Sequence, residues 1–374
     1  MHHTSDTTPR FHEASVVVGV DVHKFSHAAV ALDPWGQEKG RFAFSNDTLP
    51  EYTTWLHSLG RDEDVLVALE DVNGYGTHLV RVLTREGFPL RYVPAILTER
   101  ERKHSTKQHK SDFVDAHRVG TVILTKYGET LPVAEAVGDP VALKNSRELD
   151  LLLTERRDLV KQKTALKNQL HALLHQHYGD HYADKFPKPF HEKALMFYRD
   201  DLAKAAGDGV ETTARTMLAA SIVRRLARLM LLESQIISLT RELEIIGAES
   251  PSVTALAKGL HGCGVLTACT LMAEIVSIRR FASRDKLAMY AGVAPTERSS
   301  GSHNRLYTNP FGNRRLNRAL HTVALSQIAV KGDDRGKKYY QKKLKEGKTK
   351  LWALRCLKRQ IAKSVFRILM EQTP

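Results

Sequence analysis

Hydrophobic and polar positions follow two different spacings over the first 93 residues of the chain. Short runs of β-branched and other apolar residues predict strands over residues 16–22, 27–33, 38–45, 65–70 and 90–93. Leu49, Tyr52, Leu56 and Leu59 recur at helical spacing and predict a helix over residues 48–59. A second helix is expected over residues 75–86, because Gly87 ends it before the last strand.

The order of these elements indicates the fold class. A strand hairpin followed by alternating helices and strands is the ribonuclease-H-like arrangement, an α/β fold with a mixed sheet. We predict such a domain over residues 15–130, after a polar, disordered tail over residues 1–14. In this arrangement the ends of the first and fourth strands meet at the centre of the sheet.

Residues 141–250 follow a seven-residue apolar repeat. One stripe is formed by Leu152, Leu159, Leu166 and Leu173, and a second by Ile222, Leu229, Ile236 and Leu243. Two such stripes predict an antiparallel helical hairpin or a dimerising coiled coil. The aromatic residues of the connector have two interpretations, stacking on nucleic-acid bases or a small core of their own, and we expect the core.

Residues 255–374 are expected to form a third, mostly helical domain. Gly262 and Gly264 place a Gly-x-Gly turn between two apolar helical segments, which is similar to a helix-hairpin-helix. Glycines in such a turn let backbone N–H groups approach a phosphate. An ordinary turn is the alternative, because Gly-x-Gly commonly separates helices.

The positive charge of the chain is concentrated at its C-terminal end. The net charge is +14, and residues 298–374 hold 19 Lys and Arg against 4 Asp and Glu. Such a segment predicts a nucleic-acid-binding surface. An anionic membrane fits less well, because the cations alternate with polar residues and Tyr instead of lining one face of an apolar helix. The candidate binding residues are Arg298, Arg305, Arg314, Arg315, Arg318, Lys337, Lys338, Lys342 and Lys343.

The remaining composition is that of a protein of the cytoplasm. No apolar run reaches the length of about 18 residues that a membrane span needs, and the N-terminal segment lacks the apolar region of a signal peptide. Cys263, Cys269 and Cys356 form neither a disulfide framework nor a close set of metal ligands, which fits a reducing compartment.

Four acidic residues stand where one site can gather them. Asp21 and Glu70 each close an apolar run, and Asp112 and Asp115 lie three apart, which places them on one face of a helix. A buried, unpaired acid at a strand end costs stability unless it finds a cation. Four converging carboxylates are what a pair of Mg²⁺ ions needs for phosphodiester chemistry. Separately, each acid has an ordinary alternative, and for Asp112 that alternative is a helix N-cap.

A second candidate for chemistry is the polar segment over residues 292–302. It contains Ser299, Ser300 and Ser302, and a helix bearing several arginines follows it. A serine hydroxyl flanked by guanidinium groups is a reasonable nucleophile for phosphoryl transfer. From composition alone, a solvated Ser/Gly turn is the simpler interpretation.

The combination of motifs resembles the DEDD-type insertion-sequence transposases. These pair an N-terminal RuvC-like domain with a C-terminal serine-bearing transposase domain, and are recombinases guided by a bridge RNA that the element encodes. The resemblance covers nearly the whole chain and rests on Gly19-Val20-Asp21, Leu69-Glu70 with Gly74, Lys110-x-Asp112-x-x-Asp115-Ala116, Gly262-x-Gly264, Ala291-Gly292-Val293-Ala294-Pro295 and Ser300-Gly301.

The resemblance implies a role for each of these motifs. It implies that Asp21, Glu70, Asp112 and Asp115 hold Mg²⁺, and that Ser300, five residues after Pro295, attacks a DNA phosphate and forms a covalent phosphoserine link. Ser299 and Ser302 are the alternative nucleophiles. The implied partners are DNA, a guide RNA and further copies of the chain, as a dimer or tetramer at the bacterial nucleoid.

Two departures from the family pattern concern the site. Asp71 directly follows Glu70 and is a possible competitor for a cation, and no lysine follows Ser300-Gly301, which leaves Arg298 and Arg305 as the nearest cations. Two other functions are open. A RuvC-like structure-specific nuclease would use water and need the four acids without Ser300. A non-catalytic nucleic-acid-binding protein would need neither.

Overall fold

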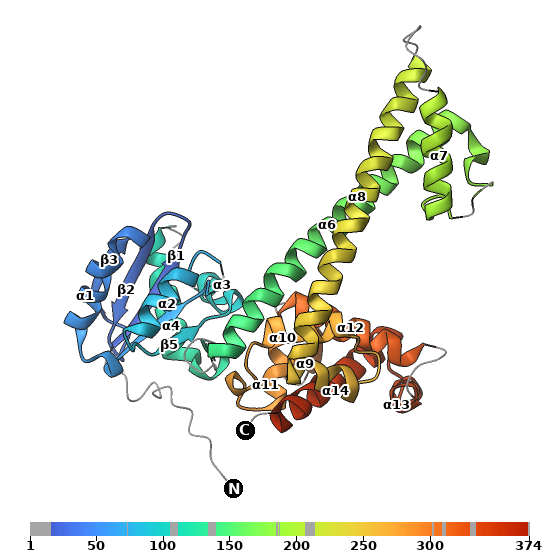
Figure 1. Cartoon of the computed structure of the whole chain (residues 1–374). Helices are drawn as coiled ribbons and strands as arrows, with labels where there is room; N and C mark the ends of the chain where they lie inside the picture. Colours follow the sequence, from blue (N-terminus) through green and yellow to red (C-terminus); the bar gives the residue numbers. More distant parts are fainter. Residues whose placement is uncertain are drawn as a thin grey trace. The chain divides into compact units, whose positions relative to one another are not determined.

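The computed structural model describes residues 16–72, 74–104, 111–133, 140–184, 186, 188–205, 214–300, 303–308, 312–329 and 334–372. The predicted tail over residues 1–14 lies outside them. The chain divides into two compact units, one of residues 1–146 together with 274–374 and one of residues 147–273 (Figure 1). Each unit is described by itself. No helix in the described ranges is long and apolar enough to cross a membrane.

The first unit contains a mixed sheet, as the sequence predicted. Its strands are β1 (Val16–Val22), β2 (His27–Leu32), β3 (Glu38–Phe44), β4 (Val65–Leu69), β5 (Leu90–Tyr92) and β6 (Leu131–Pro132). Their order in the sheet is β3-β2-β1-β4-β5-β6. β1 pairs antiparallel with β2 and parallel with β4, so β1 and β4 lie together at the centre. The short strand β6, antiparallel to β5, was not predicted.

Helices cover both faces of this sheet. They are α1 (Leu49–Leu59), α2 (Thr77–Arg85), α3 (Ala95–His104) and α4 (Asp112–Lys126). On one face Val16, Val18 and Val20 of β1 pack with residues of α1 and α2, such as Tyr52 and Leu79. On the other face Val17 packs with residues of α3 and α4. Alternate residues of β1 therefore face opposite helical layers.

The rest of the first unit is mostly helical, as expected. It contains α11 (Arg284–Tyr290), α12 (Arg314–Ile328), α13 (Asp334–Lys345) and α14 (Lys350–Glu371), and α14 packs against the other three. Two hydrogen bonds join it to the sheet domain, from Arg280 Nε to the carbonyl of Pro132 (3.3 Å) and from Lys286 Nζ to the carbonyl of Gly128 (2.5 Å). The first unit also contains the short 3-10 helices η2 (Asn46–Thr48), η3 (Asp62–Asp64), η4 (Tyr127–Glu129) and η6 (Ile278–Arg280), and the second unit contains η5 (Asp180–Ala183).

A two-stranded hairpin replaces the loop that was expected before α12. β7 (Pro295–Ser300) pairs antiparallel with β8 (His303–Thr308). The sequence showed no apolar alternation here, and backbone hydrogen bonds can pair two strands without one. The hydrophobic pattern therefore could not predict this hairpin.

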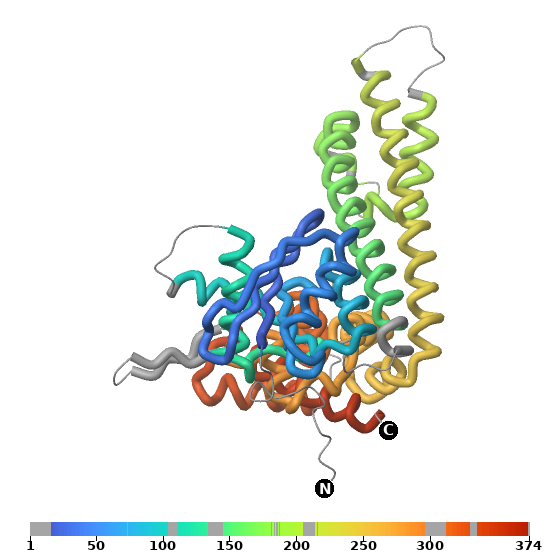
Figure 2. The backbone as a smooth tube through the Cα atoms, turned by 90° about the vertical axis from the view of Figure 1, so that its left-hand side faces the viewer, coloured from blue at the N-terminus to red at the C-terminus, as the bar shows by residue number. Residues whose placement is uncertain are grey.

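The second unit is a long helical hairpin, in which α6 (Pro140–Tyr178) and α8 (Ala214–Glu249) run side by side (Figure 2). The predicted stripe of α8 is buried at all four positions. The buried leucines in the described part of α6 are Leu149, Leu166, Leu170 and Leu174, whereas the predicted stripe positions Leu152, Leu159 and Leu173 are only partly buried. The buried face of α6 therefore follows a spacing of four residues more closely than the predicted seven.

The aromatic residues of the connector pack into an apolar core, as expected, but they share this core with α6 and α8 instead of forming one of their own. α7 (Glu192–Ala205) packs against α8, and the ring of Tyr198 is buried beside those of Tyr178 and Phe186. α9 (Pro251–Gly259) and α10 (Val265–Ile275) follow α8. The turn between them contains Gly262, whose φ of 82° is the left-handed conformation that favours glycine.

Candidate active site

Asp21 is aimed at α4 by the alternation of β1. Val17, Gly19 and Asp21 share one face of the strand, while Val16, Val18 and Val20 face α1 and α2. Its side chain is only 18% exposed. The strand therefore holds a mostly buried carboxylate next to the helix that carries the other two aspartates.

Gly19 lets α4 lie unusually close to β1. A Cβ atom on Gly19 would lie 2.1 Å from the carbonyl oxygen of Ala116 and 2.3 Å from the backbone nitrogen of Gly120. Only a residue without a side chain fits this approach. As a result, the first turn of α4 lies at the end of β1, where Asp21 is.

The first turn of α4 carries Asp112 and Asp115. The N-cap of the helix is Ser111, whose Oγ accepts a hydrogen bond from the backbone N–H of Val114 at 3.3 Å. The capping role that was the alternative for Asp112 therefore belongs to its neighbour. Acidic side chains in the first turn of a helix stabilise it, because they lie near the positive end of the helix dipole.

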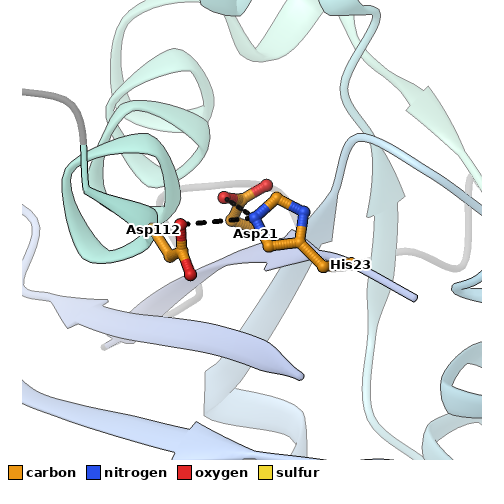
Figure 3. Close-up of side chains that lie close together, drawn as sticks. All are labelled: Asp21, His23 and Asp112. Atoms are coloured by element: carbon orange, nitrogen blue, oxygen red, sulfur yellow. Dashed lines mark ion pairs between the residues drawn. The ribbon is translucent and has the colours of Figure 1, made fainter. Parts of the chain in front are cut away.

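His23 joins this cluster, and the sequence analysis missed it. Its Nε2 lies 3.2 Å from Asp21 Oδ2 and 3.3 Å from Asp112 Oδ1 (Figure 3). The donor atoms of the three residues all lie within 4.8 Å of one another. The signal for His23 was its place two residues after Asp21, which puts both on one face of an extended chain.

Glu70 and Asp115 are held by polar partners on the helices. Glu70 directly follows β4, and its Oε2 accepts a hydrogen bond from Thr98 Oγ1 of α3 at 2.8 Å. Asp115 Oδ1 accepts a hydrogen bond from Arg118 at 2.6 Å and lies 3.7 Å from Arg102 Nη2. Burial raises the pKa of Glu70, opposed by the Thr98 hydrogen bond and by the charge of Arg102.

The charges of the other three predicted acids affect the pKa of Asp21. Burial raises the pKa of Asp21 to about 6; the His23 charge lowers it, and the charges of Asp115, Asp112 and Glu70 raise it further. The other three acids therefore lie within electrostatic range of Asp21, but of the four only Asp21 and Asp112 belong to the cluster whose ligand atoms all lie within 4.8 Å of one another. Several oxygen donors and one imidazole, crowded with like charge, fit a divalent cation.

Asp71, the suspected competitor for a cation, has a structural role. Its two carboxylate oxygens accept hydrogen bonds from the backbone N–H groups of Gly74 (2.7 Å) and Tyr75 (2.8 Å). The side chain thereby closes the turn between β4 and α2. Both oxygens accept hydrogen bonds within the turn, and Asp71 is not among the residues whose ligand atoms cluster around Asp21.

The predicted serine site lies on the β7–β8 hairpin. Ser300 ends β7 and is paired with His303, and Arg298 is the register partner of Arg305. The side chains of these residues, and Ser302, lie outside the described part of the structure. The structure therefore places Ser300 and Arg298 on β7 and His303 and Arg305 on β8.

The base of this hairpin is built by close packing and a polar cluster. A Cβ atom on Gly312 would lie 2.1 Å from the backbone nitrogen of Gly292. Asn313 caps α12 through Leu316 N (2.8 Å) and donates to Glu274 Oε2 (2.5 Å). Arg315, a predicted nucleic-acid contact, forms an ion pair with Glu274 at 2.7 Å.

The remaining predicted contacts lie on two helices and a turn. Arg314 and Arg318 are on α12, and Lys337, Lys338, Lys342 and Lys343 are on α13. Lys343 pairs with Glu346 at 2.8 Å. Gly264 stands just before α10, and a Cβ atom there would meet nothing within 4 Å.

Two family models match the chain in the regions that carry these features. One, described as a transposase, matches residues 18–179, and the other, described as transposase of the IS116/IS110/IS902 family, matches residues 255–341. The chain belongs to this family of DEDD insertion-sequence transposases. The first match contains the four acids, and the second contains the hairpin with Ser300.

Proteins of other insertion elements are similar along most of their length. An uncharacterised 43.6 kDa protein of element IS110 from Streptomyces coelicolor is 25% identical over 96% of this chain and 95% of its own. An uncharacterised 42 kDa protein of IS900 from Mycobacterium paratuberculosis is 26% identical over 92% and 93%. The transposase for IS1111A from Coxiella burnetii is 24% identical over 76% and 70%.

Proposed function

We propose that this transposase cleaves and rejoins DNA by Mg²⁺-dependent phosphoryl transfer at the site formed by Asp21, Glu70, Asp112 and Asp115. The observation that supports the proposal is the close approach of Asp21 and Asp112, whose oxygens lie within 4.8 Å of each other beside His23, with Glu70 and Asp115 near enough to raise the pKa of Asp21. The strand order is β3-β2-β1-β4-β5, and β2 alone runs in the opposite direction to the other four strands. This topology supports a ribonuclease-H-like, RuvC-like domain over residues 15–130.

The four acids hold the metal ions in this proposal. When bound, Mg²⁺ neutralises phosphate charge and stabilises the attacking and leaving oxygens of an in-line displacement. Arg118 and Thr98 fix the carboxylates of Asp115 and Glu70 through the hydrogen bonds described above. The protein thereby presents ordered oxygen donors before any substrate arrives.

Ser300 is the proposed nucleophile. Its Oγ bonds to the phosphorus while its proton passes to water, and the bond from phosphorus to a deoxyribose oxygen breaks; that oxygen leaves as a hydroxyl after taking a proton from water. In the second step a deoxyribose hydroxyl attacks the phosphoserine, and Ser300 regains its proton. Because each step exchanges one phosphodiester bond for another, strands can be rejoined without a nucleotide cofactor.

The other partners follow from charge and family. We propose that α12 and α13 contact nucleic acid, that a guide RNA directs the choice of DNA, and that the helical hairpin over residues 141–250 joins copies of the chain at the nucleoid. The domain over residues 255–374 would then bring Ser300 to the acids. This arrangement is supported by the fact that the acids and the β7–β8 hairpin belong to the same compact unit.

The test uses the full chain, Mg²⁺, DNA with the element ends and RNA transcribed from the element. We expect the wild-type protein to cleave this DNA and to form a protein–DNA adduct that survives denaturation. Asp21→Asn should lose cleavage and keep nucleic-acid binding. Cleavage that persists in Asp21→Asn would overturn the metal site.

The serine is tested by the same adduct. Ser300→Ala should lose the adduct, whereas the neighbouring Ser299→Ala should keep it. If Ser300→Ala cleaved DNA at the wild-type rate, the result would favour a nuclease that uses water as the nucleophile. The acids would then be catalytic and the serine would not.

A further inference from the structure

We propose that His23 is a metal ligand of this site and that it gives the site a preference for a divalent first-row transition metal ion, with Mn²⁺ as the probe, over Mg²⁺. The inference rests on the proposed function, because it concerns the same metal centre. It adds a nitrogen donor to the four acids and names the class of ion that the centre would select.

The first argument is the distance from the imidazole to two carboxylates. His23 Nε2 lies 3.2 Å from Asp21 Oδ2 and 3.3 Å from Asp112 Oδ1. Neighbouring ligand atoms around an octahedral ion with bonds of about 2.1 Å lie about 3 Å apart. The imidazole nitrogen is therefore already spaced from each of the two carboxylate oxygens as a neighbouring ligand of one ion would be, and small side-chain movements would suffice to bind it.

The second argument is how the side chain is aimed. His23 directly follows β1 and lies two residues after Asp21, so both side chains leave the same face of the extended chain (Figure 3). Asp112 reaches them from the first turn of α4, which the close contact of Gly19 holds against β1. The imidazole is thus positioned by secondary structure on both sides of the cluster. It is also 48% exposed, which leaves room for water and phosphate around an ion.

The third argument is ligand chemistry. Carboxylate and water oxygens alone suit Mg²⁺, which dehydrates reluctantly and seldom takes an imidazole. Replacing one oxygen donor by a neutral imidazole favours later first-row ions over Mg²⁺. Loss of the imidazole should therefore weaken Mn²⁺ binding more than Mg²⁺ binding, and the ratio of the two affinities is the signature of the proposal.

The experiment measures the ligand directly. The full-length protein is prepared with ¹⁵N-labelled histidine, loaded with Mn²⁺ below stoichiometry and studied by pulsed electron paramagnetic resonance. Wild-type protein should show hyperfine coupling of Mn²⁺ to ¹⁵N, and His23→Ala should lose it. His57→Ala is the matched control and should keep the coupling. His57 is a similarly exposed histidine, and its Nδ1 lies 2.6 Å from Asp62 Oδ1, outside the cluster around Asp21.

Affinity gives an independent readout. Titration calorimetry with Mn²⁺ and with Mg²⁺ should show the Mn²⁺ affinity of His23→Ala falling about tenfold, with a smaller loss for Mg²⁺. Absence of ¹⁵N coupling in the wild type, or an unchanged affinity ratio in His23→Ala, would overturn the role of His23. Neither result depends on DNA cleavage, so failure of this inference is distinguishable from failure of the proposed function, which the Asp21→Asn cleavage assay decides.

Discussion

Arg118 holds Asp115 from one turn further along α4, with Nη1 donating to Oδ1 over 2.6 Å. The guanidinium is buried, with 8% of its side chain exposed, while that of Asp115 is 18% exposed. Removing one partner of such a pair leaves the other charge poorly compensated. The pair therefore both orients a predicted metal ligand and stabilises the fold.

Arg118→Ala should accordingly destabilise the protein by about 2–4 kcal/mol, as expected for a broken, mostly buried pair. Urea unfolding at neutral pH measures it. The control is Lys161→Ala, which breaks the exposed pair with Asp158 at 3.0 Å and should leave the unfolding midpoint almost unchanged. Equal, small effects of both substitutions would show that Asp115 does not depend on Arg118.

The stability of the metal-free protein should depend on the ionisation of Asp21. Its pKa is about 6 in the folded chain and near 3.8 when unfolded, so the folded state binds more protons between these values. The contribution of this group to the free energy of unfolding is therefore greatest at low pH and is lost as the pH rises from about 4 to about 6. The raised pKa of Glu70 acts in the same direction.

Asp21→Asn cannot lose this contribution, because the amide does not ionise. We expect its melting temperature in EDTA to exceed that of the wild type by an amount that grows from pH 4 to pH 6 and then levels off. A saturating divalent cation should raise the wild-type melting temperature and have a much smaller effect on the variant. A difference between the two proteins that is constant across this range would contradict the raised pKa.

Gly19→Ala should separate α4 from β1. The new methyl group would meet backbone atoms of Ala116 and Gly120, which cannot move aside as a flexible side chain can. We expect a loss of about 3 kcal/mol or more in unfolding free energy, together with weaker metal binding, because Asp112 moves with the helix. Gly264→Ala is the control, since that Cβ has open space, and it should keep the wild-type stability.

The sequence predicted the sheet, and the position of Asp21 and Glu70 at one edge of it, because both depend on local pattern. An apolar run identifies β1 and β4, and an acid closing each run must lie at the same edge when the two strands are parallel neighbours. The three-residue spacing of Asp112 and Asp115 likewise fixes their shared face. These inferences need no knowledge of side-chain packing.

The features that the sequence missed depend on contacts between distant segments. His23 is a ligand candidate only because α4 brings Asp112 to 3.3 Å from it, and that approach requires glycine at position 19. Asp71 resembled a competing ligand until its turn was seen to use both oxygens. The β7–β8 hairpin is paired through its backbone, which apolar periodicity does not report.

Nucleic-acid binding should depend on exposed lysines of α13. Lys338, Lys342 and Lys345 are exposed on this helix. Deleting the whole C-terminal segment would not test them, because Leu357, Ile361 and Val365 of α14 are buried. The triple substitution of the lysines by Gln removes charge without touching that core.

We expect this variant to melt at the wild-type temperature and to bind duplex DNA more weakly at every sequence. Each lost phosphate contact should make the slope of log K against log salt shallower by about 0.9, so three contacts would change it by about 2.7. Lys161→Gln, on α6, is the control for a general loss of charge. A triple variant with the wild-type slope would contradict phosphate contacts by these lysines, because losing a contact that releases counterions must make the salt dependence shallower. The arginines of α12 would then be the next candidates.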